Sequence, residues 1–156
     1  MTMNNPTVGT ISHGTLRSEV LLEAFASELR WIVGKEAAAA WPYLKTLEEA
    51  DDILTEMQDT DAEPENAQEI IAELTDMLSA LAPPYCYFGA HPGDGSDFGF
   101  WPDFDAIESD GIPRVGDASE LPDGYVGEWA LVNERGNVTL YTRVTAPEDV
   151  AQWDCV

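Results

Sequence analysis

The residues of this chain that could do chemistry are mainly carboxylates, together with two histidines. His91, Asp94 and Asp97 recur every three residues in a glycine-rich segment, and one imidazole with two carboxylates could in principle hold a divalent metal ion. The spacing does not fit an EF-hand loop, which needs oxygen ligands at alternate positions and a closing Glu at the twelfth. We therefore predict a turn whose aspartates bind backbone N–H groups, and no metal site.

No motif of the chain indicates a particular reaction. Asp103 and Asp105 could be imagined as a glycosidase-like pair, but such pairs arise by chance in a chain with thirty acidic residues. His13 stands alone near the N-terminus, and the sequence has no G-x-S-x-G nucleophile elbow and no phosphate-binding glycine loop. We expect no catalytic residue and no cofactor, and predict that the protein is not an enzyme.

The acidic residues are concentrated in one part of the chain. Residues 46–113 contain eighteen Asp and Glu and no Lys or Arg, whereas residues 1–45 hold four acids and four bases. This neutral N-terminal segment argues against uniform adaptation to salt. A formal net charge of −23 repels nucleic acids and anionic membranes and accelerates encounters with basic surfaces. We predict a basic protein partner, and no direct binding to nucleic acid or membrane.

Eight of these acids follow a helical spacing. They form two sets with successive steps of four, four and three residues, and none has a Lys four positions later. The solvated outer face of an amphipathic helix would explain one such set, but two sets without compensating cations favour a binding surface. The predicted partner-binding residues are Glu48, Asp52, Glu56, Asp59, Glu65, Glu69, Glu73 and Asp76.

Hydrophobic spacing predicts three helices before any clear strand. The first begins at Thr15 or Ser18, either of which could cap it, and ends at Gly34. The second helix is predicted over 43–58 and the third over 64–81. Prolines separate the first two helices and end the third.

From residue 85 onward, aromatic and β-branched residues dominate. Runs at 85–90 and 98–101 flank a glycine-rich loop and predict one hairpin, and 125–145 predicts a second one with its turn at 133–137. We expect an α+β fold in which three N-terminal helices pack on a small antiparallel β-sheet of these two hairpins. The 156 residues are predicted to form a single domain, with a lead-in at 1–14, a helical part at 15–81, a β part at 85–145 and a tail at 146–156 that could hold one helical turn.

Cysteines, tryptophans and hydropathy complete the sequence-based expectations. Cys86 and Cys155 are too few for a disulfide framework and too far apart for a zinc motif, and whether they meet in the fold stays open. The five Trp are expected mostly in the core. Without a run of eighteen apolar residues or the features of a signal peptide, we expect no membrane span and a cytoplasmic location.

Three segments of the chain resemble small acidic proteins encoded by phages and mobile elements. They are HGTLR at 13–17, YFGAHPGDGSDFGFW at 87–101 and GNVTLY at 136–141. The resemblance brings no catalytic residues, and it implies a setting in which mobile DNA conflicts with a bacterial host. Very acidic small proteins of that setting resemble DNA mimics that block restriction enzymes or CRISPR effectors.

The resemblance therefore implies an antirestriction or anti-CRISPR inhibitor that binds a basic nucleic-acid-binding host protein stoichiometrically. The alternative is an acidic antidote or immunity-type protein that neutralises a basic toxin without imitating DNA. An enzyme of unknown reaction is the third hypothesis.

Overall fold

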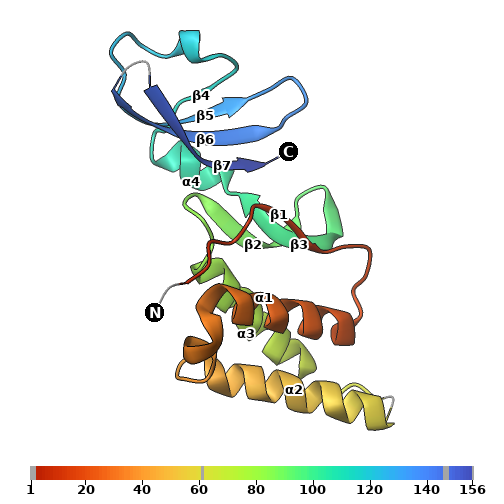
Figure 1. Cartoon of the computed structure of the whole chain (residues 1–156). Helices are drawn as coiled ribbons and strands as arrows, with labels where there is room; N and C mark the ends of the chain where they lie inside the picture. Colours follow the sequence, from red (N-terminus) through yellow and green to blue (C-terminus); the bar gives the residue numbers. More distant parts are fainter. Residues whose placement is uncertain (1–2, 61, 146–147, 156) are drawn as a thin grey trace.

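Three helices make up the first part of the fold (Figure 1). The structure is a computed structural model that describes residues 3–60, 62–145 and 148–155. The helices are α1 (Ser18–Ala38), α2 (Tyr43–Thr60) and α3 (Ala67–Ala80). Their existence and order confirm the helical part of the prediction.

The ends of the helices differ from the prediction in two places. Neither Thr15 nor Ser18 caps α1, because the Thr15 hydroxyl accepts from the Arg17 N–H and the Ser18 hydroxyl accepts from the Gln68 amide. The first regular segment of α1 ends at Gly34, as predicted, because the φ of 87° and ψ of 165° of this residue are not helical, and a short second segment continues to Ala38. α3 begins at Ala67, since the residues from Pro64 form a turn closed by the bond from the Ala67 N–H to the Pro64 carbonyl.

The first sheet packs on these helices. Its strands are β1 (Gly9–Ser12), β2 (Cys86–His91) and β3 (Asp94–Pro102), in the order β1-β3-β2, and all pairs are antiparallel. Phe25 of α1 meets Phe88 of β2 edge-to-face with ring centroids 4.9 Å apart, and Phe88 meets Phe100 of β3 at 5.0 Å. These aromatic contacts join helices and sheet into one core.

The second sheet contains β4 (Arg114–Val115), β5 (Gly127–Val132), β6 (Val138–Thr145) and β7 (Glu148–Cys155), in that order. β4 pairs with β5 in parallel and the other pairs are antiparallel. The segment before it holds α4 (Phe104–Ser109), and a 3-10 helix, η1 (Ala118–Glu120), follows β4.

Both predicted hairpins form, but the expected single four-stranded sheet was wrong, because the hairpins belong to two separate sheets. The β2–β3 hairpin pairs with the N-terminal strand β1, whereas the β5–β6 hairpin pairs with β4 and β7. The tail is a strand instead of a helical turn, since Trp153 pairs opposite Leu140 and buries its ring there. The α+β class itself is confirmed.

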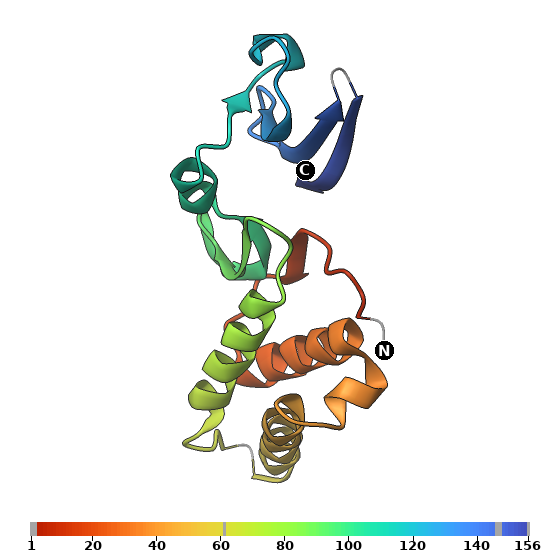
Figure 2. The same cartoon turned by 90° about the vertical axis from the view of Figure 1, so that its left-hand side faces the viewer.

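Two clusters of buried side chains correspond to two lobes stacked end to end (Figures 1 and 2). We call α1–α3 with β1–β3 the helical lobe, and α4 with β4–β7 the C-terminal lobe. The core of the C-terminal lobe consists of Ile107, Ala130, Val138, Leu140 and Trp153. The lobes meet where the Trp153 indole donates to the Pro84 carbonyl at 2.7 Å and the Tyr85 hydroxyl donates to Asp110 at 2.9 Å.

The tryptophans divide differently from the expectation. Trp101, Trp129 and Trp153 are buried, as predicted, but Trp31 is 49% exposed and Trp41 is 90% exposed. Trp31 lies on the side of α1 away from the core, and Trp41 lies in the turn between α1 and α2. Spacing along the sequence could not show that Trp31 and Trp41 are exposed, because the sequence neighbours of these two residues are as apolar as those of the buried tryptophans.

Candidate partner-binding surface

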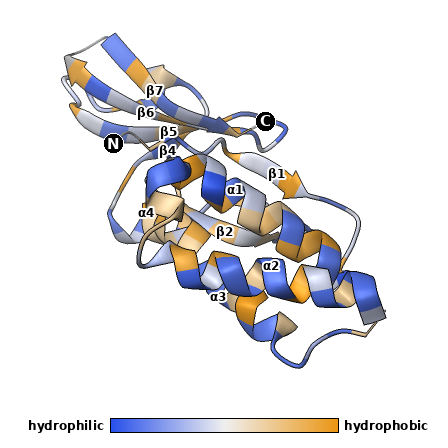
Figure 3. Ribbon diagram, turned by 60° about the horizontal axis from the view of Figure 1, so that its bottom comes forward, coloured by the Kyte–Doolittle hydropathy of each residue, from blue (hydrophilic) through white to orange (hydrophobic). Residues whose placement is uncertain are grey.

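The four predicted acids of α2 lie on its outer face. Thr46, Leu47, Ala50 and Ile53 form the buried side of α2, while Glu48, Asp52, Glu56 and Asp59 are exposed. At about 100° per residue these acids fall within about 80° of arc, on the side opposite the buried one. Figure 3 shows this amphipathic character as alternating hydrophilic and hydrophobic segments along the ribbon of α2.

The acids assigned to the third helix occupy two different environments. Glu69 and Asp76 are exposed on α3, and Glu73 between them is half-buried because its carboxylate accepts the Thr46 hydroxyl of α2 at 3.1 Å. Glu65 is exposed but lies in the turn before α3, so its predicted place in the helical register was wrong. The reason is that the turn after Pro64 delays the first helical residue to Ala67.

The hydrogen bond between Thr46 and Glu73 shows how the two rows of acids are oriented. Going around α2 from its buried side past Thr46 and Ile53, the half-buried Glu49 comes first and the exposed acids of α2 follow. Going around α3 from its buried side past Glu73, the next positions are Glu69 and Asp76. Both rows therefore lie on the same outward side of the α2–α3 pair. We call the eight residues the acidic face: Glu48, Asp52, Glu56, Asp59, Glu65, Glu69, Glu73 and Asp76.

None of the ion pairs between described residues neutralises a residue of the acidic face. The two pairs nearest to it use neighbouring acids, because Arg30 binds Asp51 at 2.7 Å and Lys45 approaches Glu49 at 3.8 Å. Asp59 lies in the last turn of α2, where the helix dipole disfavours a negative charge, and that turn contains no basic residue. Asp59 thus stands where it does not help the helix, whereas Glu69 lies in the first turn of α3, where the dipole favours it.

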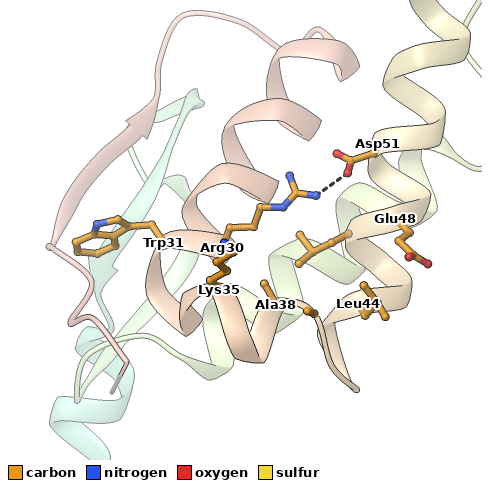
Figure 4. A pocket seen from close by; sticks show the side chains of 9 residues that line it. Arg30, Trp31, Lys35, Ala38, Leu44, Glu48 and Asp51 are labelled. Atoms are coloured by element: carbon orange, nitrogen blue, oxygen red, sulfur yellow. Dashed lines mark hydrogen bonds and ion pairs between the residues drawn. The ribbon is translucent and has the colours of Figure 1, made fainter. Parts of the chain in front are cut away.

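A cavity of about 540 Å³ marks the border of the acidic face toward α1 (Figure 4). Arg30 reaches across it to Asp51, and Trp31 points to the opposite side of α1. Its lining residues are Arg30, Trp31, Lys35, Ala38, Ala39, Leu44, Leu47, Glu48 and Asp51. Two cations on α1 therefore bound the negative surface on this side, and the acidic face extends from Glu48 toward α3.

His91 and Asp94 of the predicted loop flank a tight hairpin turn. His91 ends β2, Asp94 begins β3, and the Gly93 N–H donates to the His91 ring nitrogen at 2.9 Å. Asp94 accepts from the N–H and hydroxyl of Ser96, and these bonds lower the pKa of Asp94 below its usual value. This confirms the predicted role of an aspartate that binds backbone in the turn. Asp97 lies within β3 and not in the turn.

Of the other candidate residues, one has a structural role, and the contacts of the rest reveal no role. Asp103 caps α4 by accepting the Ala106 N–H at 3.1 Å, and Asp105 is exposed in the first turn of that helix. His13 is exposed and its ring lies 3.6 Å from the Asp94 carboxylate. Among the described residues, no group of three or more His, Cys, Asp or Glu is placed to hold a metal ion.

The structure also contains a polar cluster that sequence reasoning missed. Asp149 of β7 accepts two bonds from the Arg143 guanidinium, at 2.8 and 2.9 Å, and one from the Trp129 indole at 3.0 Å. The ring of Trp129 also stacks on that of Tyr141. The sequence contained one signal, an arginine in a strand with no other charged residue, but its partner could be recognised only once β7 was known to be a strand.

Comparison of the chain with protein-family models, with curated proteins and with solved structures found no match. Within the described ranges, no helix combines the length and the apolar character that crossing a membrane requires. What the acidic face can do is therefore judged from its own geometry. Separated carboxylates on two packed helices can meet many cations of a large surface at once, and they do not converge on a single reacting atom.

Proposed function

We propose that this protein is an acidic, DNA-mimic-type inhibitor that binds a basic nucleic-acid-binding protein of a bacterial host, such as a restriction enzyme or CRISPR effector, in the host cytoplasm. The observation that carries the proposal is the acidic face, in which two rows of carboxylates share one outward side and have no ion-pair partner among the described residues. The resemblance to proteins of phages and mobile elements supports the setting.

The dimensions of the acidic face suit a nucleic-acid channel. From Glu48 to Asp59 the row on α2 is about 16 Å long at 1.5 Å per residue. Duplex DNA presents a phosphate about every 3.4 Å along each strand, so one row covers about half a turn of backbone contacts. Because α2 and α3 pack on a common core, the carboxylates are held in place before binding, which reduces the entropy lost on association.

The test compares two variants of equal net charge. The face variant carries Glu48→Gln, Asp52→Asn, Glu56→Gln and Asp59→Asn. The control variant carries Glu108→Gln, Asp123→Asn, Glu134→Gln and Glu148→Gln, four exposed acids of the C-terminal lobe without hydrogen-bond or ion-pair partners among the described residues. Both remove four negative charges, so the only difference is their position.

Each protein is immobilised and used to capture proteins from a bacterial lysate, with and without excess duplex DNA, and the captured proteins are quantified by mass spectrometry. We expect the native protein and the control variant to capture the same basic DNA-binding protein. The face variant should capture at least about tenfold less of it, with the difference clearest at low salt. Excess duplex DNA should displace the captured DNA-binding protein from the native protein and from the control variant. Equal capture by all three proteins contradicts the proposal, and a partner that duplex DNA does not displace favours the antidote alternative.

A further inference from the structure

The two cysteines of the chain lie near the junction of the lobes. Cys86 is the first residue of β2 and Cys155 is the last residue of β7. Both side chains are half-buried and pack against the same apolar cluster of the C-terminal lobe. Residues 69 positions apart in the sequence therefore share one small core.

Backbone contacts hold the two cysteine segments together. The Trp153 indole donates to the Pro84 carbonyl at 2.7 Å, and each of these residues lies two positions before one of the cysteines. In β7, Cys155 pairs opposite Val138, whose side chain belongs to the shared cluster. On the other segment, the Cys86 N–H donates to the Pro83 carbonyl. The positions of both thiols are thus set by contacts other than their own.

We propose that Cys86 and Cys155 form an intramolecular disulfide under oxidising conditions, and that this bond ties the helical lobe to the C-terminal lobe. The oxidant is a small-molecule disulfide of the glutathione class. One cysteine thiolate attacks oxidised glutathione, which forms a mixed disulfide and releases one reduced glutathione. The second thiolate attacks the protein sulfur of that mixed disulfide and releases the other, so two protein thiols lose two protons and two electrons and one oxidised glutathione becomes two reduced molecules.

The surroundings determine how the reaction proceeds. Burial raises the pKa of the Cys86 thiol to about 12, with a further contribution from the nearby charge of Cys155, and burial also raises the pKa of Cys155. Exchange should therefore be slow near neutral pH and accelerate as the pH rises, because only the thiolate attacks. Cys155 also lines a cavity of about 110 Å³ beside His91 and Trp101.

The bond would close a loop from residue 86 to residue 155 and would join the lobes near the contact between Trp153 and Pro84. The chain-entropy effect of a loop of this size predicts a rise of the melting midpoint of roughly 10–15 °C in the oxidised protein. The test incubates the native full-length protein with oxidised glutathione at mildly alkaline pH. Intact mass, peptide mapping without reductant and thermal denaturation are the readouts.

We expect a mass lower by two hydrogens, a peptide that links Cys86 to Cys155, and a higher melting midpoint that dithiothreitol reverses. The Cys86→Ser and Cys155→Ser variants should show neither the linked peptide nor the rise. The proposal is overturned if the native protein ends with glutathione on both cysteines, links only to a second molecule, or reacts only after unfolding in urea. A linked protein that melts at a lower temperature would also contradict it, because the native fold would not accommodate the bond.

Discussion

Asp149 is a carboxylate whose surroundings favour its ionised form. The Arg143 guanidinium donates two hydrogen bonds to it and the Trp129 indole donates a third, and these bonds lower the pKa of Asp149 below its ordinary value. The side chains of Arg143 and Asp149 are 10% and 17% exposed, so solvent screens the pair only weakly. Asp149 therefore has a cationic partner, whereas the carboxylates of the acidic face have none among the described residues.

Replacing Asp149 by Asn should destabilise the protein in a pH-dependent way. Because the folded pKa lies below the unfolded one, the ionised carboxylate stabilises the fold above the unfolded pKa, near 3.9, and this contribution disappears as the pH falls through the folded value. We expect the melting midpoint of D149N to lie several degrees below that of the native protein near neutral pH, with the gap closing toward about pH 3. Thermal denaturation across this range measures the gap.

The matched control for Asp149 is E134Q, a change at an exposed acid in the turn between β5 and β6. It should leave the melting midpoint nearly unchanged at every pH. Parallel curves for D149N and the native protein would show that the Arg143 bonds do not depend on the charge of Asp149. The comparison of two proteins removes the effect of the other carboxylates, which also titrate in this range.

At the scale of the elements, the N-terminal strand depends on one glycine of β3. Gly99 pairs with Thr10 of β1, and a Cβ added to Gly99 would lie 2.0 Å from the Gly9 carbonyl oxygen. That distance is inside the contact limit of any two non-bonded heavy atoms, and the atom in the way belongs to backbone. The close approach of β1 therefore requires glycine at this position.

Gly99→Ala should detach β1 from the first sheet. We expect a loss of about 1–3 kcal/mol in the free energy of unfolding, typical of overpacking, and faster hydrogen exchange at the amides of β1 than at those of β2. Gly95→Ala serves as the control, because nothing lies within 4 Å of the Cβ that it adds in the same strand. If β1 amides exchange at the native rate in G99A, the strand has shifted to accommodate the methyl group and the proposed dependence is wrong.

Local sequence signals predicted the elements better than their pairing. The three helices follow from hydrophobic spacing, and both hairpins follow from aromatic runs around turns. The strand β7 was missed because half of its residues are polar, and only Trp153 is well buried among its described side chains. Whether two hairpins share a sheet depends on contacts between distant segments, such as that of β1 with β3, which no local pattern encodes.

The acidic face, too, could be predicted only in part from local sequence patterns. Helical spacing predicted that the acids of α2 share an outer face, and their exposure agrees with it. It could not predict that Glu73 bonds Thr46 across the two helices, nor that Glu65 falls in a turn. The orientation of one row relative to the other is a tertiary property, and here the hydrogen bond between the helices reveals it.

At the scale of the whole molecule, the negative charge is far from balanced by ion pairs. The formal net charge is −23, and the ion pairs of the described residues leave the acidic face uncompensated. Five neighbouring pairs of like charges within α2 and α3 would together cost about 1–2.5 kcal/mol. A protein that keeps such an arrangement gives up stability in the unbound state, and a basic partner would restore it by supplying the missing cations.

Salt should therefore stabilise the unbound protein. The screening length is about 10 Å at 0.1 M ionic strength and about 3 Å at 1 M, so added salt weakens repulsion between carboxylates on neighbouring helical turns. We expect the melting midpoint to rise with NaCl concentration, and to rise less in the variant with Glu48→Gln, Asp52→Asn, Glu56→Gln and Asp59→Asn, which should already melt higher at low salt.

The four substitutions in the C-terminal lobe provide the control of equal net charge, and they should leave more of the salt response in place because they do not remove charges in helical register. A native midpoint that does not rise with salt would mean that the acidic face is not under electrostatic strain, and an equal response of both variants would mean that net charge, and not the arrangement on α2 and α3, determines it.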